Sequence, residues 1–156
     1  LRNVGFDGLI KRPGYGDDPA FSIYVNHIKT KTGIRDIDRA LTITRLADVV
    51  RMIREGNNAE AQKIFYGEFY APGHVPILLG RVGRRFGHTE LSLLMSRMAG
   101  ILPALVIVEM LSDDGEALSK DAVLRIANDL GTVVISGGEI IREAERRGII
   151  KEAAIK

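Results

Sequence analysis

The sequence predicts a layered fold in which α-helices cover one β-sheet, and three observations support this prediction. Segments of strand type alternate along the chain with segments that have a helical apolar repeat. Two further runs, 104–111 and 132–136, are almost wholly apolar, which is typical of strands buried on both faces. With 156 residues, of which 46% are hydrophobic, the chain can bury one core. Strands that alternate with helices indicate α and β layers around one sheet, whose strand order stays open.

The first half of the chain is expected to begin with a strand and a long helix. Residues 21–27 alternate in polarity and are rich in β-branched and aromatic side chains, which is typical of a strand. Residues 37–55 fit a helix, because one face carries Ile43, Leu46, Ala47, Val50 and Ile53. Residues 59–71 are ambiguous and fit a short helix followed by an extended segment. Residues 75–82 fit a strand whose proline lies at its start or edge.

The second half is expected to alternate helices with the two apolar strands. Thr89 is predicted to cap a helix that ends near Gly100 and has a buried stripe formed by Leu91, Leu94, Met95 and Met98. Ser119 is predicted to cap a second helix, which follows the first apolar strand. A last helix over 138–147 is expected after the second apolar strand.

The composition excludes several classes of protein. No cysteine is present, so disulfides and thiolate catalysis are excluded, and only His, Asp or Glu could hold a metal. No apolar run is long enough to cross a bilayer and no secretory pattern is present, so we expect a cytoplasmic protein without a membrane partner. The net charge of +2 is small and the basic residues are not interleaved with aromatic ones, which argues against a nucleic-acid partner.

A histidine and two arginines stand where the helix after residue 88 is predicted to begin. Free N–H groups and the dipole at a helix N-terminus attract anions, and Arg84 and Arg85 add fixed positive charge. The stretch therefore predicts a pocket for phosphate or another small anion, in which His88 could bind a divalent metal that the substrate shares. An ordinary surface or capping role for His88 is the alternative, and the spacing alone does not decide between them.

Glu109 and His74 each admit two interpretations. Glu109 lies inside the run 104–111, where it either reaches the surface or pairs with an arginine, or is buried. A buried carboxyl group would hold its proton more tightly, as general acid–base catalysis near neutral pH requires. His74 follows a Pro-Gly turn that could present its side chain at a fixed angle, although an ordinary turn histidine fits as well.

Three other polar positions have simple structural explanations. His27 lies at the end of the first strand and is interpreted as structural or surface. Asp38, which precedes Arg39, lies near the start of the long helix, where the helix dipole favours an acidic residue. Residues 113–115 are most simply a turn.

Five stretches of the sequence together resemble the 3,4-dihydroxy-2-butanone 4-phosphate synthase family. The stretches are TGIRDIDRALTI, FYAPGHVPIL, RRFGHTELSLLMSRMAG, VIVEMLSDDGEALSK and GTVVISGGEII. Their order and approximate spacing match over about residues 21–147. The R-x-G-H-T-E string that begins at Arg85 is the most specific of them.

The resemblance implies both a reaction and a fold. The family converts D-ribulose 5-phosphate into L-3,4-dihydroxy-2-butanone 4-phosphate and formate in riboflavin biosynthesis, with Mg²⁺ (or Mn²⁺). The implied fold is α+β, a single domain with a three-layer α/β/α arrangement around a mixed β-sheet. The implied assembly is a homodimer whose sites lie close to the interface.

The resemblance also implies a role for each matching residue. His88 would be a metal ligand, and the sugar phosphate would be held by Arg85 and Thr89. His74 and Glu109 would be the acid–base pair that removes and returns protons beside an enediolate stabilised by the metal. The pocket would be shaped by Thr32, Asp38 and Arg39.

One motif of the family has no counterpart here. The family carries an acidic loop of the type D-x-R-E-G-E-x-D, which supplies a second metal ligand, whereas residues 3–10 hold one aspartate and no glutamate. The segment between His74 and His88 is also a few residues short, and Gly80 stands near an expected arginine. We expect the acidic loop to lie outside the printed sequence, which does not begin with Met. A shortened, non-catalytic homologue that binds a sugar phosphate or acts as a scaffold is the alternative.

Overall fold

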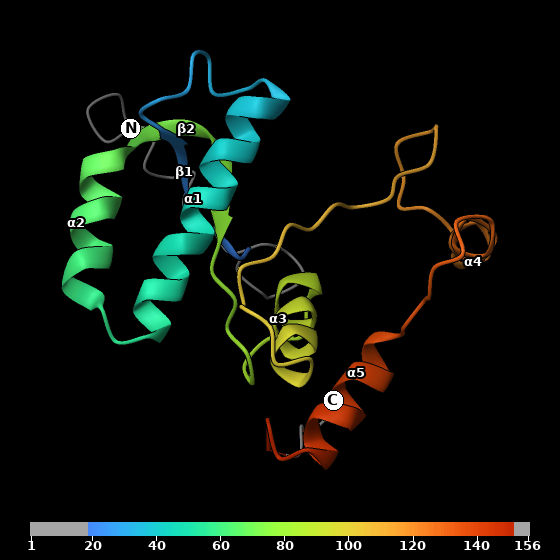
Figure 1. Ribbon diagram of the computed structural model, residues 1–156. Helices are drawn as coiled ribbons and strands as arrows, with labels where there is room; N and C mark the ends of the chain where they lie inside the picture. The colour runs from blue at the N-terminus through green and yellow to red at the C-terminus, as the bar shows by residue number, and fades with distance from the viewer. Residues whose placement is uncertain (1–18, 152–156) are drawn as a thin grey trace, which may run out of the picture.

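The computed structural model describes residues 19–151, so the predictions on residues 3–10 lie outside the described part. Its elements are β1 (Phe21–His27), α1 (Asp36–Arg54), α2 (Asn58–Glu68), β2 (Phe69–Leu78), α3 (His88–Met98), α4 (Lys120–Asp129) and α5 (Gly137–Arg146). Figure 1 shows α1 and α2 side by side next to the β1–β2 pair, with α3 and α5 forming a second group. A long extended segment leads from α3 to α4, which stands apart from the other helices.

The two strands form an antiparallel pair in which Phe21 lies opposite Leu78 and His27 opposite Phe69. The predicted strand 21–27 is confirmed. The ambiguous segment 59–71 divides into α2 and the start of β2, which therefore begins earlier than predicted. The register shifts between Val25 and Asn26. A Cβ at Gly73 would collide with the backbone of Val25, so the close approach of the two strands at this irregularity requires a glycine.

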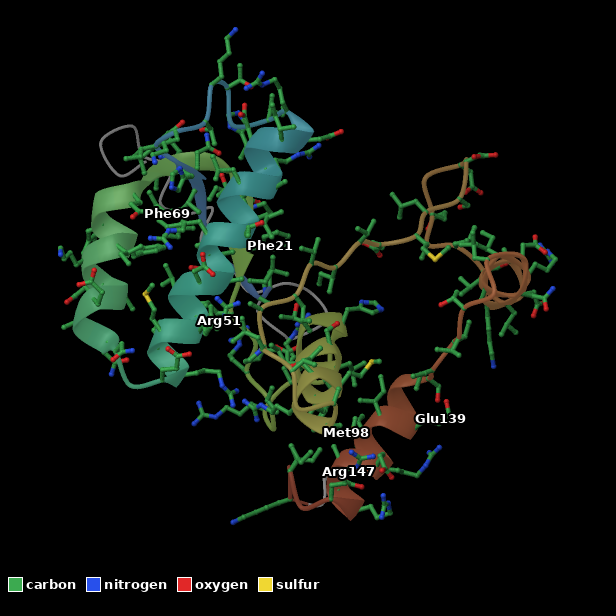
Figure 2. All side chains as sticks on the ribbon, viewed as in Figure 1. Phe21, Arg51, Phe69, Met98, Glu139 and Arg147 are labelled. Carbon is green, nitrogen blue, oxygen red and sulfur yellow. The ribbon has the colours of Figure 1, made fainter. Side chains whose placement is uncertain are left out.

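Helix α1 confirms the prediction for 37–55 to within a residue, and its ends suit the helix dipole. Its first turn is acidic and its last turn carries Arg51 and Arg54. It packs with α2 against the strand pair around a core of Val25, Val49, Ala61 and Phe69. Figure 2 labels Phe69, which lies between α2 and the strands.

The second core joins α3 to α5 through Leu94, Ile140 and Ala144. The predicted cap of α3 is wrong: the helix begins at His88 and Gly87 occupies the N-cap position, where its N–H donates to Glu90. The predicted cap of α4 is confirmed, because Ser119 Oγ accepts the N–H of Ala122 at 3.3 Å. The last predicted helix is also confirmed, beginning one residue earlier than expected.

The predictions that 104–111 and 132–136 are buried strands are wrong for the described structure. Both segments are extended but mostly exposed, and Val108 and Val133 are 87% and 79% exposed. An extended segment becomes a strand only by pairing its backbone, and within residues 19–151 the sheet consists of β1 and β2 alone. The α+β class is therefore confirmed with a two-stranded sheet, whereas the three-layer mixed sheet is not confirmed. No described helix is long and apolar enough to cross a bilayer.

Candidate functional site

An open groove runs between β2, the helices α1 and α3, and the extended segment 103–108. Its volume of about 1320 Å³ exceeds the roughly 300–1,000 Å³ of a typical ligand pocket, so it is a broad depression rather than a fitted cavity. Most of its lining is apolar. The polar part includes three predicted site residues, namely Arg39, His74 and Thr89.

The other predicted residues are not among the residues that line this groove within the described part of the chain. His88 immediately precedes Thr89 and is exposed, and Arg85 lies in the preceding loop. Glu109 follows directly on Val108, the last lining residue of the extended segment. The burial considered for Glu109 is wrong, because its side chain is exposed where the apolar run has no neighbouring strand to cover it. That His88, Arg85 and Glu109 act together with the groove residues stays a prediction.

His74 is held by a buried amide on the neighbouring strand. Asn26, which is 1% exposed, accepts the backbone N–H of His74 through Oδ1 at 2.8 Å. Its Nδ2 lies 3.0 Å from the ring atom Nδ1 of His74 and donates to the Tyr70 hydroxyl, also at 3.0 Å. These contacts fix the position of the imidazole beside the groove, although His74 as a whole is exposed.

A buried carboxylate in the first turn of α1 organises the loop before that helix. Asp38 accepts the backbone N–H groups of Thr32 and Gly33, both at 3.0 Å, and a bidentate pair of hydrogen bonds from Arg35. The hydrogen bond from Arg35, together with those from the loop backbone, holds the pKa of Asp38 well below its ordinary value despite burial. Asp38 thus organises the loop that contains Thr32, whereas the role of Thr32, Asp38 and Arg39 in shaping a substrate pocket stays a prediction.

The same loop rests on the amide that holds His74. Gly33 has a φ of +80° and packs on Asn26, whose carboxamide occupies the space that a Cβ at position 33 would need. The start of α1 and the candidate acid–base histidine are therefore joined through one buried side chain.

A second buried carboxylate organises the loop before α3. Glu90 is fully buried and accepts the N–H of Arg81 at 2.9 Å, the N–H of Gly87 at 3.2 Å and a guanidinium hydrogen of Arg85 at 2.8 Å. Burial opposes its ionisation, but the N–H of Arg81 and the charge of Arg85 outweigh burial, so the pKa of Glu90 lies below its ordinary value. The ion pair fixes Arg85, whose Nε is buried and has no partner among the described residues.

The described residues do not fit a magnesium site on their own. No group of three or more histidine or acidic side chains able to hold a metal occurs within residues 19–151. His88 is a single imidazole, whereas Mg²⁺ prefers several oxygen ligands. The metal role of His88 therefore stays a prediction.

Asn26 and Glu90 were missed in the sequence analysis. The sequence does contain a signal for Glu90, because a glutamate three residues after an N-cap is half of a capping box. The signal depends on the correct cap: with Thr89 as the N-cap, Glu90 would be the first residue of the helix instead of the third. No local signal marks Asn26 among the alternating residues of β1. The structural interpretation of His27 is supported, since the ring is buried and makes an ion-pair contact with Glu68 at 3.3 Å.

Comparison with known proteins agrees with the class that these features define, an α+β domain with a groove beside a helix N-terminus. The sequence profile of 3,4-dihydroxy-2-butanone 4-phosphate synthase matches residues 9–143. A 3,4-dihydroxy-2-butanone 4-phosphate synthase of Methanosarcina mazei is 43% identical over 139 residues, covering 86% of this chain and 53% of that protein. One of Archaeoglobus fulgidus is 41% identical over 131 residues, covering 81% of this chain and 53% of that protein.

The chain therefore belongs to the 3,4-dihydroxy-2-butanone 4-phosphate synthase family. A solved structure of RibBX from A. baumannii, a two-domain 3,4-dihydroxy-2-butanone 4-phosphate synthase, is similar in fold, with a TM-score of 0.68 and 24% identity. That match covers 87% of this chain and 37% of the RibBX chain. The chain spans about half the length of the archaeal relatives.

Proposed function

We propose that the protein to which this chain belongs is a lyase of riboflavin biosynthesis, converting D-ribulose 5-phosphate to L-3,4-dihydroxy-2-butanone 4-phosphate and formate. The observation that carries the proposal is that one groove of a chain of this family is lined by His74, Thr89 and Arg39. These side chains come from β2, α3 and α1, and their shared groove supports the proposal that an imidazole, a helix N-terminus and a cation act on one substrate.

Each side chain has a proposed part in the reaction. Thr89 and Arg85 bind the phosphate at the start of α3, where free N–H groups add to the attraction. His74 and Glu109 move the protons that the rearrangement requires. Thr32, Asp38 and Arg39 shape the side of the groove that α1 forms.

A requirement for Mg²⁺ (or Mn²⁺), with His88 as one ligand, stays a prediction, as do the homodimer and the cytoplasmic location. A bound divalent ion would polarise the sugar oxygens and stabilise the enediolate. EDTA is expected to stop the reaction of the full-length protein and added Mg²⁺ to restore it. Light scattering of the purified protein tests the homodimer.

Formate release from D-ribulose 5-phosphate by the full-length protein tests the proposed activity. Glu109→Gln and His88→Ala are each expected to lower kcat by about 100-fold or more, the usual contribution of an acid–base or metal-binding group. Glu116→Gln, in the exposed turn that follows the apolar run, is the matched control and is expected to keep the wild-type rate. Sugar-phosphate binding by the folded full-length protein without any formate would contradict the lyase and support a binding role.

A further inference from the structure

We infer that Asn26 is a positioning residue that fixes the tautomer of His74, so that the neutral ring carries its proton on Nε2 and donates it into the groove. The inference deepens the proposed function and rests on it, because it assigns His74 the donor half of the acid–base pair. Three hydrogen-bond contacts of one buried amide carry the argument.

The orientation of the Asn26 amide is set by a partner whose own role is fixed. The backbone N–H of His74 can only donate, and it lies 2.8 Å from one end of the Asn26 side chain. That end is therefore the carbonyl oxygen, and the other end is the NH₂ group. No assumption about the amide flip is needed.

The NH₂ group then determines the role of the imidazole. Its two hydrogens have two partners at 3.0 Å, the Tyr70 hydroxyl and Nδ1 of His74. Since Nδ2 can only donate, Nδ1 of His74 accepts and carries no proton in this arrangement. In a neutral imidazole the proton is then on Nε2, at the other edge of the ring.

The second histidine of the strand pair provides an internal reference. Nδ1 of His27 accepts the backbone N–H of Lys29 at 3.1 Å, so its neutral ring also carries the proton on Nε2. That proton is used within the fold, because Nε2 of His27 lies 3.3 Å from Glu68. His74 has no such carboxylate partner within residues 19–151 and borders the groove, so its proton is available to a substrate oxygen.

The tautomer has a direct chemical consequence. A neutral ring with the proton on Nε2 can donate a hydrogen bond to an oxygen that becomes negative during the reaction, while the proton stays on the ring. It cannot remove a proton through Nε2, because that nitrogen already carries a hydrogen and has no free lone pair. A proton taken up by the ring would have to go on Nδ1, where the new N–H would face the NH₂ group of Asn26. Proton removal therefore falls to the other member of the pair, Glu109.

Nitrogen NMR of ¹⁵N-histidine-labelled full-length protein, at a pH where the imidazoles are neutral, tests the inference directly. The chain contains three histidines, which single substitutions can assign. We expect the proton on Nε2 in both His74 and His27. A proton on Nδ1 of His74 in the wild-type protein would overturn the inference without reference to any variant.

Asn26→Asp is the decisive variant, because it keeps the shape of the side chain and replaces the NH₂ donor with an acceptor. The proton of neutral His74 is then expected on Nδ1, and kcat for formate release is expected to fall by about 100-fold with a smaller change in KM. Tyr70→Phe, which removes the other partner of Nδ2, is the matched control and is expected to leave the tautomer on Nε2. His27 is expected to be unchanged in both variants.

The outcomes separate this inference from the proposed function. An unchanged tautomer and wild-type turnover in folded Asn26→Asp would overturn the positioning role while the lyase stands. Absence of formate from the wild-type protein would overturn the lyase, whereas the tautomer would still be decided by NMR.

Discussion

Two loops of the molecule are built in the same way around a buried carboxylate and differ in how far the paired arginine is exposed. Asp38 organises residues 31–35 before α1, and Glu90 organises residues 81–87 before α3; each accepts loop N–H groups and one arginine. The arginine that pairs with Asp38 is 45% exposed, whereas the one that pairs with fully buried Glu90 is 20% exposed. The comparison teaches that the ion pair of the first loop reaches solvent through its arginine, whereas the ion pair of the second loop is largely buried.

The largest effect in this comparison is expected for Glu90→Ala. The substitution leaves the guanidinium of Arg85 largely buried without its partner, which typically costs about 3–5 kcal/mol. Urea unfolding measures the loss. Glu139→Ala is the matched control, because Glu139 accepts the N–H of Ser136 in the exposed capping box of α5 and is expected to cost much less. Figure 2 shows Glu139 near the start of α5. Equal losses in both variants would show that burial of the Arg85 pair contributes nothing.

Asp38→Asn is expected to have a smaller effect on global stability and a clear local one. The amide cannot accept all the bonds from Thr32, Gly33 and Arg35, so the loop opens more often. Amide hydrogen exchange of residues 31–33 is expected to become faster by roughly tenfold or more, the ratio that loss of a hydrogen bond to a charged acceptor gives. Asp36→Asn is the control, since Asp36 is 99% exposed and should not alter exchange in the loop. Unchanged exchange in folded Asp38→Asn would show that the carboxylate does not hold the loop.

Acid is expected to weaken both loops. The pKa values of Asp38 and Glu90 are lowered in the folded state, and the hydrogen bond from Arg45 lowers that of Glu68 to about 2. Because the unfolded chain binds protons at higher pH than the folded chain, the free energy of unfolding is largest above about pH 5 and falls toward pH 2. Urea unfolding at several pH values measures this dependence, which should be shallower in Glu68→Gln. A free energy of unfolding that stays constant down to pH 3 would contradict the prediction.

The smallest effect is expected for Glu143→Gln at the end of α5. Glu143 pairs with Arg146 and Arg147 on the surface, where screening by salt leaves little net stabilisation. Arg147 keeps its hydrogen bond to the carbonyl of Met98, and Figure 2 shows the two residues close together. Thermal unfolding should differ from the wild type by an amount near the limit of detection. A loss comparable to that of Glu90→Ala would contradict the importance of burial.

The helices and the strand pair could largely be predicted from the sequence because their signals are local. The apolar repeat of residues 37–55 and the cap at Ser119 act over a few residues, and both appear in the structure. The exposure of segments 104–111 and 132–136 could not be predicted from local signals. An apolar run becomes a buried strand only through partners distant in sequence, and the described residues provide none for these two segments.

The candidate site could be predicted in part for the same reason. Arg39, His74 and Thr89 were identified from their motifs and share the lining of one groove. The contacts that hold them could not be predicted, because Asn26 meets His74 only through the register of two strands 48 residues apart. The apolar neighbours of Glu109 favour its burial, whereas its exposure depends on what lies beside that run.

The packing of Gly33 on Asn26 has a consequence for how sequences of this kind can change over time. A larger residue at position 33 would push the carboxamide away from His74, so it would disturb the hydrogen bond to the imidazole although position 33 does not line the groove. A substitution at 33 would then be tolerated only together with a shorter side chain at 26 and another donor for the imidazole. Positions 26, 33 and 74 are thus expected to vary as a set across descendants of this chain, with drift at any one of them constrained by the other two.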